Sequence, residues 1–218
     1  MDKIIFYIRH VLQNKTIYRL LFNYKVKQYQ TLIKGRVLDL AGGGEASYHQ
    51  FISKTADLIT TDYIQKPGVD MVVDINERLP FDDNTFDTVL FFNALYIIKD
   101  PVFSLGEIRR ILVPGGNLYI ASPFISNEMP SPHDYRRFTG EGIIDILYKA
   151  GFNNEKIERF GERFSVAIYA IEPFLFFRFI KAFVFVLALF LDKLIPTKIK
   201  TIHPMPLGYF VSVSNNKE

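Results

Sequence analysis

The stretch Val37-Leu38-Asp39-Leu40-Ala41-Gly42-Gly43-Gly44-Glu45 decides the fold of this 218-residue chain. Its apolar start predicts a buried strand, and its three glycines predict a loop that ends in an acid. A second apolar strand ends in Asp62, twenty-three residues after Asp39. Glycines let a ligand approach the backbone, and a carboxylate on the next strand accepts hydrogen bonds from ribose hydroxyls. The spacing therefore indicates a site for a nucleotide-like cofactor.

The sequence after this loop continues the pattern. Asp74 and Ile75 follow a short apolar run, and residues 79–87 (LPFDDNTFD) lead into a strand that ends at Asn93. A glycine-rich turn alone also arises simply to connect a strand tightly to a helix. The further acids favour the cofactor site. A nicotinamide fingerprint is disfavoured, because it requires Gly-x-Gly-x-x-Gly and the three glycines here are contiguous.

Taken together, these segments resemble the class I S-adenosylmethionine-dependent methyltransferases. The small bacterial members have a skeleton of the form DLGxG, D, LPFxDxxFD and EIxRxLxPGGxLxIxxP. The matching segments here are residues 39–44, Asp74, residues 79–87 and residues 107–116. Residues 132–139 (PHDYRRFT) are also similar to a PHDYxRFT segment of methyltransferases from surface-glycan pathways. The resemblance covers roughly residues 30–160.

Two residues of the loop depart from the family pattern. Members usually carry glycine where this chain has Ala41, and often another where it has Glu45. The alanine methyl would crowd the cofactor slightly at negative φ and would cost more at positive φ. Glu45 would repel the methionine carboxylate, although it would also meet the positive end of a helix. A reduced affinity is expected, and a catalytically silent relative stays an alternative.

The resemblance implies S-adenosylmethionine as the cofactor and assigns its contacts. The methionine end would be held by Asp39 and by the backbone of Ala41, Gly42 and Gly43. Ribose hydroxyls would bind Asp62, with Tyr63 beside it, and the adenine amino edge would bind Asp74 and Ile75. Asn93, at the carboxyl end of the fourth strand, would lie beside the reacting methyl, where α/β sheets place their ligands.

A hydroxyl acceptor loses a proton during methyl transfer, and His133 is the candidate base. It follows the carboxyl end of the fifth strand and titrates near neutrality, and Asp134 would orient it or act itself. Alternatively, the Pro-His-Asp-Tyr turn only pins its loop. His10, His49 and His203 have no comparable partners in the sequence and no metal-ligand spacing, so no metal site is expected.

The alternation of short β-branched runs with helical stretches predicts an α/β fold. We expect a Rossmann-like, seven-stranded, mostly parallel sheet with helices on both faces and an apolar helical insertion before the last strand. Strands are expected at 36–40, 58–62, 70–73, 87–92, 116–122, 155–160 and 208–214, and helices at 45–53, 101–112 and 139–150. The expected parts are an N-terminal helical cap (1–34), a cofactor-binding domain (35–163), the insertion (164–200) and the final strand (201–218).

The insertion is the most apolar part of the chain, with few charged residues between positions 164 and 195. A single membrane crossing would separate the final strand from its sheet, so we predict a helical hairpin or in-plane helix that dips into one leaflet. A dimer interface or a lid over the cleft stays an alternative. Anionic head groups would be met by Arg178, Lys181, Lys193, Lys198 and Lys200.

Composition narrows the function. A net charge of +3 without a basic, aromatic stripe disfavours a nucleic-acid partner, and zero cysteines exclude disulfides. We expect a cytoplasmic methyltransferase, peripheral on the inner face of the membrane, that methylates a hydroxyl of a saccharide or lipid-linked glycan. A quinone or other small lipid as acceptor, and a catalytically silent membrane-associated scaffold, are the alternatives. The sequence leaves open whether the chain forms a homodimer.

Overall fold

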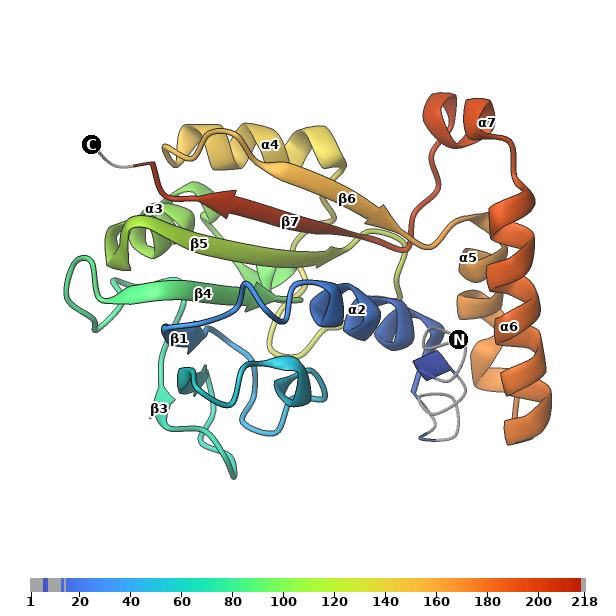
Figure 1. Ribbon diagram of the computed structural model, residues 1–218, viewed down its shortest axis with the longest axis horizontal. Helices are drawn as coiled ribbons and strands as arrows, with labels where there is room; N and C mark the ends of the chain where they lie inside the picture. The colour runs from blue at the N-terminus through green and yellow to red at the C-terminus, as the bar shows by residue number, and fades with distance from the viewer. Residues whose placement is uncertain (1–5, 8–12, 14, 217–218) are drawn as a thin grey trace.

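A computed structural model describes residues 6, 7, 13 and 15–216, so part of the predicted N-terminal cap and His10 lie outside the described residues. The fold is a seven-stranded sheet in the order β3-β2-β1-β4-β5-β7-β6 (Figure 1). β1 to β5 pair in parallel, and β7 runs antiparallel to both β5 and β6. The strands are β1 (Arg36–Asp39), β2 (Asp57–Asp62), β3 (Met71–Val72), β4 (Phe86–Phe92), β5 (Leu112–Pro123), β6 (Lys156–Phe160) and β7 (Gly208–Ser214). The predicted mostly parallel sheet is confirmed.

Both faces of the sheet are covered because successive strand residues point to opposite sides. In β4, Val89 and Phe91 join one apolar cluster, which α3 and α4 complete. Leu90 and Phe92 join the other cluster, on the side of α2, α5 and α6. Fully apolar strands of this kind are typical of buried parallel sheets.

The helices expected at 101–112 and 139–150 form, and capping residues fix where they begin. The described helices of the sheet domain are α2 (Ile17–Gln28), α3 (Pro101–Ile111) and α4 (Gly140–Lys149), with short 3₁₀ turns η1 (His49–Phe51) and η2 (Leu95–Ile97). The Asp100 carboxylate accepts hydrogen bonds from two backbone N–H groups of α3, and the Thr139 hydroxyl accepts one from Gly142. Gly151, at φ 87°, follows α4 in the left-handed conformation.

The helix predicted over residues 45–53 is wrong. Only the 3₁₀ turn η1 forms there, because Tyr48 and His49 both direct their side chains to the Asp39 carboxylate. Adjacent residues of an α-helix do not face the same way, so a helix could not bring both to one partner. The hydrogen bonds to buried Asp39 therefore determine the local conformation, although the sequence pattern favours a helix.

The apolar insertion is helical, as predicted. Its elements are α5 (Arg163–Ile171), η3 (Glu172–Phe174), α6 (Arg178–Leu194) and α7 (Thr197–Ile202). Figure 1 shows them gathered at one end of the sheet, with α6 running across the strand direction. Among the described residues, every helix is too short or too polar to cross a membrane. The division of the chain into cap, domain, insertion and final strand stays our proposal.

Candidate functional site

Two neighbouring cavities lie where the strand order changes direction. Strand β1 has β2 on one side and β4 on the other, and parallel sheets bind ligands at the carboxyl ends of such strands. The first cavity has a volume of about 440 Å³ and the second about 520 Å³. Ala41, Asn93 and Tyr96 line both of them. One elongated ligand could therefore extend across these three residues from one cavity into the other.

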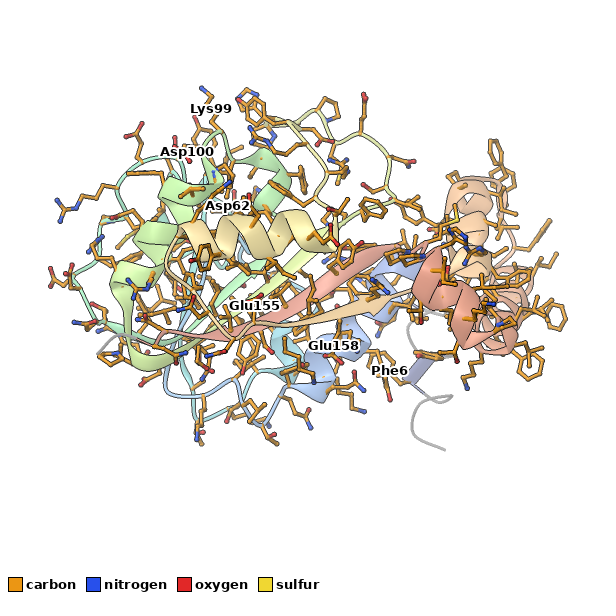
Figure 2. All side chains as sticks on the ribbon, turned by 90° about the horizontal axis from the view of Figure 1, so that it is seen from above. Phe6, Asp62, Lys99, Asp100, Glu155 and Glu158 are labelled. Atoms are coloured by element: carbon orange, nitrogen blue, oxygen red, sulfur yellow. The ribbon has the colours of Figure 1, made fainter. Side chains whose placement is uncertain are left out.

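The first cavity brings together most of the residues predicted to bind the nucleoside. Its predicted lining residues are Ala41, Asp62, Tyr63, Asp74, Ile75, Asn93 and His133. Lys99 and Asp100 also line it, and Figure 2 shows both on the same side of the molecule as Asp62, far from Phe6. The cavity wall combines apolar side chains with acids from separate strands, as binding sites for small molecules commonly do.

The two acids of this cavity that were predicted to bind the cofactor, Asp62 and Asp74, are held by their own turns. Asp62 Oδ1 accepts a hydrogen bond of 3.1 Å from the backbone of Ile64, and Oδ2 lies 3.2 Å from Lys66 Nζ. Asp74 Oδ1 accepts from the backbone N–H of Asn76 at 2.9 Å. Lys66 is half exposed, so its ammonium can leave Asp62 when a ribose hydroxyl approaches. Both carboxylates are thus positioned without being fully engaged.

The glycine loop adopts a conformation that few other residues tolerate. Ala41, Gly43 and Gly44 all have positive φ, at 65°, 74° and 67°. A Cβ at Gly43 would lie 3.0 Å from Asp62 Oδ2, and one at Gly44 would lie 2.2 Å from the carbonyl oxygen of Pro67. Gly42 and Gly43 line the second cavity. The loop therefore exposes backbone to the cavity at the position predicted for the methionine end.

Asp39 lies behind this loop and lines neither cavity. Its carboxylate is fully buried, accepts from Tyr48 Oη at 2.9 Å and lies 2.6 Å from His49 Nε2. Burial raises the pKa of Asp39, and the hydrogen bond from His49 opposes that shift. His49 therefore has a partner, contrary to the sequence-based expectation. The geometry gives Asp39 the task of shaping the loop.

Replacing Ala41 by glycine is expected to increase stability. An alanine in the left-handed region costs about 1–2 kcal/mol, and glycine's larger unfolded-state entropy offsets part of the gain. We expect the free energy of unfolding, measured in urea, to rise by about 0.5 kcal/mol for Ala41→Gly. Ala46→Gly, in the same loop without positive φ, is the matched control and should lower it. A loss of stability in Ala41→Gly would contradict the strain.

Asn93 lies at the boundary of the two cavities and also has positive φ, at 56°. Its Oδ1 accepts a hydrogen bond of 2.5 Å from Tyr18 Oη of α2. Burial raises the pKa of the Tyr18 phenol, so it remains a donor at neutral pH. Helix α2 thereby holds the side-chain amide of Asn93, which was predicted to lie beside the reacting methyl.

Several lining residues of the second cavity were missed by sequence reasoning. They are Lys15, Thr16, Tyr18, Arg19, Tyr48, Tyr96, Ser126, Met129 and Tyr169. Tyr96 could have been found, because it follows Asn93 by one helical turn in sequence. Tyr18 and Tyr169 could not, because helices α2 and α5 reach the site only through tertiary packing. The second cavity is thus closed partly by α2 and α5, which lie outside the residues that carry the resemblance.

The two predicted catalytic residues are separated by the structure. His133 lines the first cavity and stacks on Tyr135, with ring centroids 5.3 Å apart. Asp134 instead binds the Arg137 guanidinium and accepts from the backbone N–H of Met129 at 2.8 Å. The Arg137 hydrogen bonds lower the pKa of Asp134, so it is a weak base. Among the described residues, no group of three His, Asp or Glu side chains could hold a metal ion.

Comparison with known proteins finds a family match over the part of the chain that contains the glycine loop. The family described as "Methyltransferase domain" matches residues 39–120. A demethylmenaquinone methyltransferase from Renibacterium salmoninarum is 30% identical over an alignment of 95 residues, and the match covers 39% of this chain and 40% of that protein. The chain therefore matches about two fifths of the length of this curated relative.

Solved structures share the whole fold at lower identity. A methyltransferase from Archaeoglobus fulgidus is 18% identical with a TM-score of 0.62, over 90% of this chain and 94% of that one. A phosphoethanolamine N-methyltransferase from Haemonchus contortus, solved with S-adenosyl-L-methionine, is 19% identical with a TM-score of 0.54. That similarity covers 87% of this chain and 53% of the other. Both similarities extend beyond residues 39–120 and include most of the chain.

Proposed function

We propose that this chain, a member of the class I S-adenosylmethionine-dependent methyltransferases by its matching domain and its fold, methylates a hydroxyl of a saccharide carried on a lipid. The observation that carries this proposal is the junction of the two cavities at Ala41 and Asn93. A nucleoside in the first cavity and an acceptor in the second would meet at that junction. The reaction would take place on the inner face of a membrane.

The residues of the first cavity suit the cofactor. Asp62 would accept from the ribose hydroxyls, next to Tyr63, and Asp74 with Ile75 would receive the adenine amino edge. The backbone of Gly42 and Gly43 would face the methionine end, because both residues line the second cavity without a side chain. The bound cofactor would supply a methyl group already activated by positively charged sulfur.

The protein's remaining task would be alignment and proton removal. The acceptor oxygen would approach from the second cavity, past the hydroxyls of Tyr18 and Tyr169. The proton of the acceptor hydroxyl would pass to His133, which lines the first cavity. Tyr96 lines both cavities and would lie along this path. Asp134 would keep the loop of His133 in place through its ion pair with Arg137. No step requires a metal ion.

The lipid part of the proposal is supported by the position of the insertion. Tyr169 belongs to α5 and lines the second cavity. An acceptor that enters the second cavity would therefore pass the most apolar segment of the chain. The saccharide part rests on the resemblance of residues 132–139 to glycan-pathway methyltransferases.

A quinone acceptor is the second candidate. It is favoured by the named activity of the Renibacterium salmoninarum relative, which this chain matches only in part. A quinol also carries a hydroxyl on a lipid, so both candidates place a polar acceptor atom next to an apolar chain. The two differ in the polar group that the second cavity must hold.

The acceptor class can be identified with labelled cofactor. Purified protein is incubated with methyl-labelled S-adenosylmethionine and a membrane extract, which is then separated into glycolipid, quinone and protein fractions. We expect label in the glycolipid fraction, and much less of it when Asp62→Asn replaces the wild type at a low concentration of cofactor. Label in the quinone fraction would select the second candidate. Absence of label together with absence of cofactor binding would instead favour a silent scaffold.

A further inference from the structure

Helix α6 has the reverse of the usual amphipathic pattern. Its inward face carries Lys181, Phe185, Ala188 and Asp192, all buried, at intervals of three or four residues. A helix on the surface of a globular protein normally directs its polar residues outward. The outward face is apolar from Phe179 to Phe190, and Arg178 and Lys193 are exposed near the two ends of the helix. Its apolar residues are Phe179, Ile180, Phe183, Val186, Leu187, Phe190 and Leu194.

Residues before α6 extend the same exposed surface. Ile171 ends α5, and Phe174, Phe176 and Phe177 lie between α5 and α6. All four are exposed, Phe176 by 81%. Phe179, the first aromatic residue of the helix, is exposed by 83%. We call these residues, together with the outward face of α6, the aromatic face. Figure 2 shows the side chains of this end of the molecule projecting away from the sheet. Apolar surfaces of this extent mark interaction sites.

Buried charges hold the hairpin in this orientation. Asp192 accepts hydrogen bonds from the backbone of Phe164 at 2.8 Å and Ser165 at 3.2 Å, at the start of α5. Glu172 accepts from the backbone of Ile17 at 3.0 Å and lies 3.5 Å from Lys181 Nζ. Turning α6 over would leave these buried charges without partners, which is strongly unfavourable. These buried contacts therefore fix the orientation of α6 and keep the aromatic face exposed.

The charges that remain exposed on the insertion are all positive. Between residues 164 and 202 the only acids are Glu172 and Asp192, and both are buried. Arg178, Lys193 and Lys198 are exposed around the aromatic face. Lys181 is buried against Glu172, so the sequence-based expectation that it meets head groups is wrong. An apolar surface with a basic rim complements a negatively charged interface.

A third cavity continues from the aromatic face toward the sheet. Val186 and Phe190 belong both to the face and to this cavity, which has a volume of about 610 Å³. Its other apolar lining residues include Leu21 of α2 and Leu189 of α6. Its charged lining residues are Arg159, Glu162, Asp192, Lys193 and Lys200. Three of the five charges are basic, which is consistent with a negatively charged neighbour at this end of the molecule.

We propose that the aromatic face is a docking surface for the anionic surface of a lipid bilayer. The phenylalanines of α6 and of the preceding turn enter the apolar region of one leaflet, and Arg178, Lys193 and Lys198 contact the head groups. A second copy of the chain is a poorer occupant, because a symmetric contact through this face brings the basic rims of the two copies together. In the docked state, the side of the second cavity that is formed by Tyr169 of α5 would face the membrane.

Bilayer docking can be observed with a single introduced fluorophore, because the chain contains no tryptophan. Phe179→Trp places the probe on the aromatic face, and Phe103→Trp, on the exposed side of α3, is the matched control. Vesicles with anionic phosphatidylglycerol should shift the emission of Phe179→Trp to shorter wavelength and leave Phe103→Trp unchanged. Vesicles of phosphatidylcholine alone should give a weaker shift. Equal spectra for the probe with and without either vesicle would overturn the proposal.

Flotation of the chain without the probe gives an independent test. Phe176→Ser, Phe179→Ser and Phe183→Ser, combined in one variant, change only exposed side chains, so the variant should unfold at the same urea concentration as the wild type. We expect the fraction bound to anionic vesicles to fall about tenfold or more. Unchanged flotation of the variant would overturn the proposal. The wild type could instead fail to float and form a concentration-dependent dimer that the variant does not form. That result would assign the aromatic face to a second copy of the chain and would also overturn the proposal.

These measurements contain neither cofactor nor acceptor, so they are independent of the proposed methyl transfer. Binding of S-adenosylhomocysteine by the serine variant should equal that of the wild type, because the changed residues line neither cavity of the candidate site. A chain that floats but does not bind the cofactor would support the docking surface and contradict the methyltransferase function. A chain that binds the cofactor but does not float would contradict the docking surface and support the methyltransferase function.

Discussion

Replacing Asp62 by asparagine is expected to weaken the binding of S-adenosylhomocysteine about tenfold to a hundredfold, without lowering the free energy of unfolding. A hydrogen bond to a charged group contributes about 1.5–3 kcal/mol, and each 1.4 kcal/mol changes affinity about tenfold. The fold should be retained because, among the described residues, the Asp62 carboxylate bonds to the backbone of Ile64 and to Lys66, both at the surface. Titration calorimetry measures the affinity directly.

The matched control lies at the other end of the same strand. Asp57 begins β2, is largely exposed and pairs with Arg36 at 3.7 Å. Asp57→Asn removes the same charge from the same strand but far from both cavities, so its affinity should equal that of the wild type. Equal affinities of Asp62→Asn and the wild type, with both folded, would contradict the assignment of Asp62 to the ribose.

Replacing Gly42 by alanine is expected to damage both the fold and the site. A Cβ at Gly42 would lie 2.0 Å from Asp39 Oδ2, closer than any real contact allows. Asp39 cannot move aside easily, because it is fully buried and bound by Tyr48 and His49. Overpacking of this kind typically costs about 1–3 kcal/mol and occasionally more, and we expect about 3 kcal/mol from urea unfolding. Affinity for S-adenosylhomocysteine should fall with it.

Gly106 provides the control for this prediction. It lies within α3, and a Cβ built there meets no atom within 4 Å. Gly106→Ala should therefore raise the free energy of unfolding, since alanine in a helix is about 1 kcal/mol more favourable than glycine. A Gly42→Ala variant that is as stable as the wild type would show that the loop rearranges. The roles assigned to Asp39 and to the loop would then be wrong.

The fold could be predicted from the sequence where local pattern and tertiary structure agree. The apolar runs of β1, β4 and β7 indicated their strands correctly, and the helices expected at 101–112 and 139–150 form as α3 and α4. In each case the residues that form the element also bury or cap it. The segment after the glycine loop failed because a distant requirement, the satisfaction of buried Asp39, overrides its helical pattern.

The residues of the candidate site could be predicted from the sequence only where they follow the carboxyl end of a strand. Asp62, Asp74 and Asn93 follow apolar strands, and the topology of a parallel sheet brings strand ends to one edge. The contribution of Tyr18 depends on how α2 packs across the sheet, which no local pattern encodes. For the same reason the buried state of Lys181 was missed: its partner Glu172 lies on η3, outside the helix that carries the lysine.

The central claim, that the glycine loop and the acids of neighbouring strands bind one S-adenosyl nucleoside, is tested most directly by a crystal structure with S-adenosylhomocysteine. We expect the ribose at Asp62, the adenine between Asp74 and Ile75, and the sulfur beside Asn93, at the junction of the two cavities. Crystals that contain the compound elsewhere, or that show Ala41 and its loop blocking an empty first cavity at saturating concentration, would contradict the account.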